Sequence, residues 1–140
     1  MILYLDTSSL VKLFVEEPGS NEVGSLVNSA GAAGTSIIAY AESRAAFARK
    51  FREDAVPQKE YKRLVSLFIK SWDIFFQINT SPTLIKLAGS LAEKHALRGF
   101  DAVHLASAIV LKDQSGLKPV FSCFDDKLQN ASIEEDLAQP

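Results

Sequence analysis

Residues 1–9 of the chain read MILYLDTSS. The apolar run at residues 2–5 has no alternating polar positions, which is typical of a strand buried on both faces, as in a parallel α/β sheet. The run ends at the polar cluster DTSS, residues 6–9, whose residue types favour the start of a helix. The stretch therefore predicts a buried strand that leads directly into a helix.

The rest of the chain repeats this alternation. Three further short apolar runs, at residues 35–38, 73–78 and 119–124, have the length of buried strands. Helix-favouring stretches lie between them, at residues 20–30 and 39–52, from residue 57 onward, and at residues 81–95 and 101–112. Strands separated by helices predict an α/β sandwich with a parallel sheet. No repeat, low-complexity tract or linker interrupts the pattern, so we expect residues 1–140 to form a single domain.

Composition excludes several classes of protein. The chain has 140 residues, is 47% hydrophobic and carries a net charge of −2, which excludes an intrinsically disordered chain. No apolar run approaches the ~18 residues that a membrane helix needs, and no basic segment typical of a signal peptide opens the chain. A single cysteine cannot form an internal disulfide, so we expect a reducing, cytoplasmic setting.

Acidic residues follow the predicted strands. Asp6 comes directly after the first strand and Asp125 after the fourth, and Glu42 lies one turn into the helix after the second. Carboxyl ends of parallel strands meet at one edge of the sheet, so we expect these three residues to lie together. Asp101 opens a helix that follows another helix. A simple antiparallel pair would place it at the opposite edge, and only a skewed or broken segment near residues 97–99 would return it.

The chemistry of such a cluster is restricted by its charge. Crowded carboxylates repel one another unless a cation neutralises them, and a site of oxygen ligands without His or Cys suits Mg²⁺ or Mn²⁺ better than zinc. Such a metal activates water and stabilises charge on a phosphoryl oxygen, which predicts metal-dependent phosphodiester hydrolysis. The structural alternatives are helix caps at Asp6 and Asp125, a partner of a helix dipole at Asp101, and an exposed helix residue at Glu42.

Four segments resemble motifs of the PIN-domain family, in particular the VapC-type toxin ribonucleases of toxin–antitoxin pairs. They are LYLDTSSLVKLF at residues 3–14, AYAESRAAF at 39–47, LRGFDAVHLASA at 97–108 and FSCFDDKL at 121–128. They occur in the family's order and span nearly the whole chain. The resemblance implies a three-layer α/β/α sandwich around a parallel sheet of four to five strands.

The same resemblance implies a function and its residues. It assigns an acidic metal site to Asp6, Glu42, Asp101 and Asp125, with Thr7 as a hydrogen-bond donor beside it. The implied activity is Mg²⁺- or Mn²⁺-dependent cleavage of RNA by an endoribonuclease. The implied partners are an inhibitory VapB-like antitoxin and, since homodimers are usual in the family, a second copy of the chain.

The chain also departs from the family pattern. Cys123 stands two residues before Asp125, where the family commonly has Thr or Ser. The tail after Leu128 is acidic and lacks the apolar run of a fifth strand. Asp126 is a rival to Asp125 and could assist or replace it as a ligand.

Basic residues gather in one part of the chain. Residues 44–70 hold eight basic and three acidic residues, which predicts either solvated helix faces or a grip on the RNA backbone by Arg44, Arg49 and Lys50. His104 lies one turn beyond Asp101 in an apolar helix, and we interpret it as a packed or hydrogen-bonded structural residue.

Two other functions are open. A non-catalytic PIN-like module that binds RNA or protein would be expected to have lost an acidic position, and all four are present. A phosphoacceptor receiver domain needs an Asp at the end of the third strand, where Asn79 and Thr80 follow instead, and a Lys at the end of the last.

Overall fold

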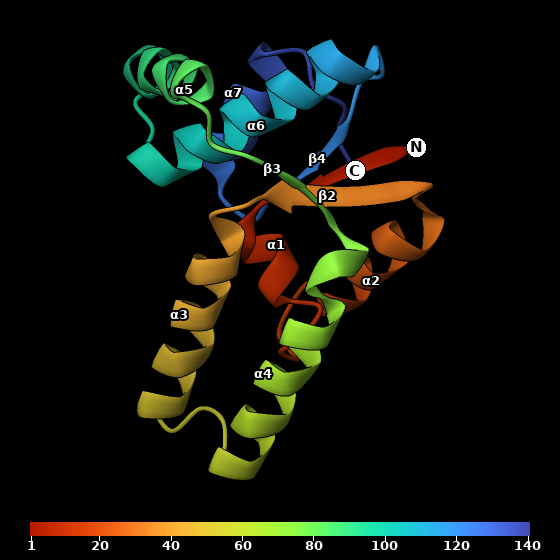
Figure 1. The fold of residues 1–140 in the computed structure, drawn as a ribbon, viewed down its shortest axis with the longest axis vertical. Helices are drawn as coiled ribbons and strands as arrows, with labels where there is room; N and C mark the ends of the chain where they lie inside the picture. The colour runs from red at the N-terminus through yellow and green to blue at the C-terminus, as the bar shows by residue number, and fades with distance from the viewer.

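Strand β1 (Ile2–Leu5) lies inside a four-stranded, all-parallel sheet of order β3-β2-β1-β4 (Figure 1). The computed structural model describes residues 1–140. The other strands are β2 (Ala32–Ser36), β3 (Phe76–Ile78) and β4 (Val120–Ser122). The predicted parallel sheet is therefore confirmed, and it has four strands.

Helices cover both faces of this sheet (Figure 1). One layer holds α5 (Pro82–His95), α6 (Gly99–Ser115) and α7 (Asp126–Glu134), and the other holds α1 (Thr7–Val11), α2 (Ser20–Ser29), α3 (Ala39–Arg52) and α4 (Gln58–Ser71). Neighbouring residues of β1 belong to two separate cores. Tyr4 packs in the core of the α5–α7 layer, whereas Leu3 and Leu5 pack in the core of the α1–α4 layer. The unalternated apolar run of β1 thus reflects burial on both faces.

Strand β2 begins earlier than the predicted 35–38. It spans Ala32–Ser36, and Ile37 beyond it is 40% exposed. The apolar, β-branched residues predicted a later strand, but β2 starts at the small residues Ala32 and Ala33, which pair with Ile2 and Leu3 of β1. The ring of Phe76 lies against Gly34, where a Cβ atom would overlap it. The predicted third strand is also shorter, because Trp72–Ile74 form a 3₁₀ turn.

The acidic tail forms a helix, α7, that its mostly polar composition does not predict. Helix α7 buries Leu128, Ala131 and Ser132, and two of these are too small to stand out as an apolar face. After α7, Ala138 makes a single parallel bridge to Val120, so no fifth strand forms. None of the helices combines the length and apolar composition needed to cross a membrane.

Helices α5 and α6 cross rather than lie antiparallel. In Figure 1, α5 is seen nearly along its axis, while α6 runs across the view. Ala96 ends α5 in the left-handed conformation, with φ 53°, and a short turn leads into α6 at Gly99. The turn and the crossing return the start of α6, and with it Asp101, to the carboxyl edge of the sheet.

Candidate active site at the carboxyl edge of the sheet

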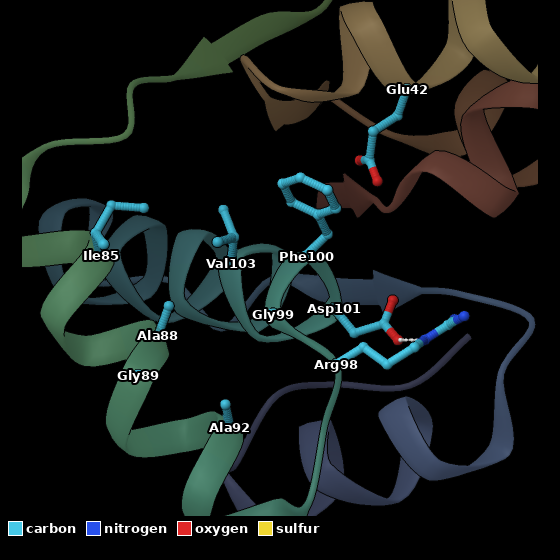
Figure 2. A pocket seen from close by; sticks show the side chains of 10 residues that line it. All are labelled: Glu42, Ile85, Ala88, Gly89, Ala92, Arg98, Gly99, Phe100, Asp101 and Val103. Carbon is cyan, nitrogen blue, oxygen red and sulfur yellow. Dashed lines mark hydrogen bonds and ion pairs between the residues drawn. The ribbon is translucent and has the colours of Figure 1, made fainter.

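Four acidic side chains from distant parts of the chain line one cavity of about 660 Å³. Asp6 follows β1, Glu42 lies in the first turn of α3, Asp101 in the first turn of α6, and Asp125 follows β4. Figure 2 shows the carboxylates of Glu42 and Asp101 pointing toward each other. The four predicted site residues are thus neighbours, including Asp101.

Asp6 and Asp125 are each fixed by a helix that they cap. Oδ1 of Asp6 accepts hydrogen bonds from the backbone N–H of Ser9, at 2.9 Å, and from the hydroxyl of Ser8, at 2.7 Å. Oδ1 of Asp125 accepts one from the backbone N–H of Leu128, at 2.8 Å. The capping role considered for both residues is therefore present, and it leaves Oδ2 of each without a partner in the protein.

Glu42 and Asp101 also use only one carboxylate oxygen each for contacts within the protein. Oε1 of Glu42 accepts a hydrogen bond from the Thr7 hydroxyl at 2.6 Å and lies 2.8 Å from Nε2 of His104. Oδ2 of Asp101 accepts one from Nε of Arg98 at 3.1 Å. Oε2 of Glu42 and Oδ1 of Asp101 have no partner. Each of the four carboxylates therefore has one anchored oxygen and one free oxygen.

The charge state of two of these groups is set by their surroundings. Burial raises the pKa of Asp6, which is only 5% exposed, against the lowering effects of His104 and of the hydrogen bonds from Ser8 and Ser9. Burial also acts to raise the pKa of Glu42, but hydrogen bonds from His104 and Thr7 outweigh it and lower that pKa. Burial thus disfavours the ionised form of Asp6, and a nearby cation would stabilise that form.

His104 connects the core to the site. Its side chain is 2% exposed, its Nδ1 lies 2.8 Å from the hydroxyl of Tyr4, and its Nε2 lies between Glu42 and Thr7. The structure thus contains a chain of contacts from the buried Tyr4 through the buried His104 to the half-buried Glu42. The sequence predicted a structural histidine, but not that it would hold a site residue, because Tyr4 and Glu42 lie far from it along the chain.

Basic residues form the rim of the same cavity. Of the predicted RNA contacts, Arg49 and Lys50 line it, whereas Arg44 does not. The guanidinium of Arg44 donates a hydrogen bond to the Tyr40 hydroxyl at 3.0 Å, and the residue lines a separate depression with α4. Three further basic residues line the cavity: Arg52, from the same basic stretch 44–70, and Lys12 and Arg98, which lie outside that stretch.

Two other residues discussed from the sequence lie beside the site. Asp126 is exposed in the first turn of α7 and does not line the cavity. Cys123 is partly buried, and its thiol lies 3.6 Å from the backbone oxygen of Asp125. Burial raises the pKa of the Cys123 thiol to about 12, so it is neutral at physiological pH.

The donor set fits a hard divalent cation, although the side chains do not enclose one. No group of three or more His, Cys, Asp or Glu side chains is arranged to hold a metal ion. The four free carboxylate oxygens are nevertheless the ligand type that Mg²⁺ and Mn²⁺ prefer. A cation among them would also offset the repulsion between like charges.

A second, mainly apolar cavity of about 600 Å³ adjoins the acidic one. Figure 2 shows its apolar wall, formed by α5 and the beginning of α6. Phe100, at its edge, is 64% exposed. The two cavities share Glu42, Arg98 and Asp101, so a molecule bound in one would contact residues of the other.

Comparisons with known proteins concern the family and the fold of the chain. The family model described as PIN domain matches residues 3–133. Two proteins of Mycobacterium tuberculosis, Ribonuclease VapC45 of strain CDC 1551 / Oshkosh and Ribonuclease VapC49 of strain ATCC 25618 / H37Rv, are each 38% identical over 112 residues. The match covers 80% of this chain and 78% of each relative.

A solved structure supports the fold. A chain in the crystal structure of FitAcB from Neisseria gonorrhoeae superposes with a TM-score of 0.70, over 99% of this chain and 96% of that one. The two chains are 18% identical in sequence, so the likeness concerns the fold alone.

Proposed function

The chain belongs to the PIN-domain family, and from that premise we propose that it is a metal-dependent endoribonuclease of the VapC type. The observation that carries the proposal is the set of four carboxylates that line one cavity, each with one anchored and one free oxygen. Relatives that are 38% identical are named ribonucleases, which supports RNA as the substrate.

Asp6, Asp101 and Asp125 would hold the metal through their free oxygens. When bound, Mg²⁺ or Mn²⁺ supplies an activated water and neutralises charge on the phosphoryl oxygen. The anchored oxygens keep the three side chains in place without that ion, because helix starts and Arg98 hold them. Burial of Asp6 excludes competing water from one side of the site.

Glu42 acts as an orienting group. Thr7 and His104 hold its Oε1, which leaves Oε2 free to accept a hydrogen bond from the attacking water. A general base works best when its pKa is close to the working pH. The lowered pKa of Glu42 therefore favours a role in ligation and orientation of water over proton abstraction.

The basic rim would hold the RNA backbone. Phosphate contacts from Lys and Arg supply affinity without reading sequence. The net charge of −2 does not oppose this role, because the four site acids account for part of the 17 acidic residues of the chain. We also propose a VapB-like antitoxin as inhibitor, for which the adjoining apolar cavity offers a surface, together with homodimer formation and a cytoplasmic location.

The test is RNA cleavage with Mg²⁺ or Mn²⁺ by the wild-type chain, Asp6→Asn and Asp101→Asn. Asparagine keeps the size of the side chain and, at position 6, the helix cap. Asp126→Asn is the matched control, since it removes the same charge next to the site without lining the cavity. We expect loss of cleavage in the first two variants only. Cleavage by both at the wild-type rate, or cleavage that persists in EDTA, would refute the proposal.

A further inference from the structure

An ion-pair cluster on the rim of the acidic cavity contains an acidic residue, Glu17, for which the proposed function gives no role. Lys12 lies at the end of α1, Glu17 in the loop before α2, and Lys50 in α3. Lys12 Nζ lies 3.0 Å from Oε1 of Glu17, and Lys50 Nζ lies 3.0 Å from its Oε2. All three residues line the cavity that holds the four carboxylates. One carboxylate therefore bridges two ammonium groups beside the site.

The position of Lys12 is fixed by its surroundings. Its side chain is only 12% exposed, and its ammonium lies 4.4 Å from the centre of the Phe124 ring. The same ring packs against Gly19, whose φ is 95°. A side chain at position 19 would overlap the ring, because its Cβ atom would lie 2.7 Å from a ring carbon of Phe124. Phe124 thus holds both the lysine and the loop that carries Glu17. The site for an anion exists before any ligand binds.

The chemistry of this site matches a phosphodiester. A backbone phosphate carries one negative charge on two oxygens, as a carboxylate does, and is bound by Lys side chains in the same way. Glu17 is ionised at neutral pH: burial acts to raise its pKa, but hydrogen bonds from Lys12 and Lys50 outweigh it and lower that pKa. The carboxylate therefore presents to the two lysines the charge that a phosphate would present.

We propose that Lys12 and Lys50 form a phosphate subsite for the RNA strand next to the cleavage site, and that Glu17 occupies it as an internal competitor. The inference rests on the proposed ribonuclease function. The RNA strand displaces the Glu17 carboxylate from the two lysines when it binds. The chain therefore binds RNA more weakly than it would if Glu17 did not pair with these lysines.

The experiment measures binding of a short fluorescein-labelled oligouridine by anisotropy, in EDTA so that the RNA stays intact. We expect Glu17→Gln to bind about threefold to tenfold more tightly, because two partly exposed ion pairs no longer compete. Glu16→Gln is the matched control: it makes the same change in charge one residue away, at a side chain without an ion pair. We expect its affinity to equal that of the wild-type chain.

A second pair of variants tests the lysines without altering the loop. We expect Lys50→Met to weaken binding and to reduce the slope of log Kd against log salt by about 0.7, the value for one lost phosphate contact on a single strand. Lys86→Ala, on α5 outside both cavities, should change neither quantity. Thermal melts verify that each variant is folded.

Two results overturn the inference while leaving the proposed function intact. In the first, the wild-type chain cleaves RNA but Glu17→Gln binds no more tightly than it. In the second, Lys50→Met keeps the affinity and the salt dependence of the wild-type chain. If the wild-type chain neither binds nor cleaves RNA with any divalent metal, the proposed function itself is wrong and the inference falls with it.

Discussion

Replacing Tyr4 by phenylalanine removes one buried hydroxyl and leaves the aromatic packing unchanged. The ring of Tyr4 stacks on Phe121, with centroids 5.4 Å apart, and Phe at this position can keep that contact. The lost hydroxyl lies 2.8 Å from Nδ1 of His104, which is itself 2% exposed. A buried nitrogen left without a partner costs about 1–3 kcal/mol. We expect the free energy of unfolding in urea to fall by that amount.

The corresponding thermal shift is measurable. At about 4 °C per kcal/mol for a domain of this size, the melting temperature should fall by about 4–12 °C. Tyr61→Phe is the matched control, since the Tyr61 ring stacks on Phe51 but its hydroxyl makes no hydrogen bond in the structure. RNA cleavage by Tyr4→Phe should also decline, because His104 then holds Glu42 less firmly.

A double-mutant cycle tests the cause. In the double variant Tyr4→Phe/His104→Leu both partners are removed, so no buried polar group is left without its partner. We expect its loss in the free energy of unfolding to be smaller than the sum of the losses of the two single variants. Full additivity of the two changes, or a Tyr4→Phe variant as stable as Tyr61→Phe, would refute a stabilising contact between Tyr4 and His104.

Three further predictions concern other parts of the molecule. Gly34→Ala should lower the free energy of unfolding by about 1–3 kcal/mol through overlap with Phe76, and Phe76→Leu in the same chain should restore part of it in urea titrations. Glu17 has a lowered pKa in the folded chain, so its contribution to stability is complete above the unfolded-state pKa of about 4.3 and is lost as pH falls through the folded-state pKa. The difference in unfolding free energy between wild type and Glu17→Gln should therefore shrink on acidification from neutral pH. Millimolar Mn²⁺ should raise the melting temperature of the wild-type chain more than that of Asp6→Asn, and equal shifts would exclude Asp6 as a ligand.

Much of the fold follows from local patterns in the sequence. Helix α3 has the predicted bounds 39–52, because its alanine-rich composition and spacing are properties of consecutive residues. The bounds of β2 depend instead on its pairing with β1 at one end and with β3 at the other, both distant in sequence, so no local pattern contains them. Helix α7 escaped prediction because Ala131 and Ser132 bury too little apolar surface to mark a face.

Some residues of the candidate site also follow from the sequence, whereas others depend on contacts between distant segments. Asp6 and Asp125 follow strands, so topology alone predicts that they meet. The place of Asp101 depends on how α5 crosses α6. The left-handed residue at the end of α5 is Ala96, and an alanine, unlike a glycine, does not indicate such a conformation in the sequence. Which face of α3 points to the cavity decides that Arg49 lines it and Arg44 does not. That rotation is set by packing against α1 and α4, and not by the charge pattern.

The two capping carboxylates link the activity of the chain to its folding. Asp6 and Asp125 start α1 and α7, and loss of such a cap costs about 0.5–2 kcal/mol. In the proposed mechanism both asparagine and alanine at these positions abolish cleavage, but asparagine preserves the helix start, whereas alanine removes it. If the chain is toxic to its host, cells that escape through an alanine substitution would hold less of the protein, because the destabilised chain is removed by proteolysis. Variants with asparagine would persist as folded decoys that still sequester the inhibitor.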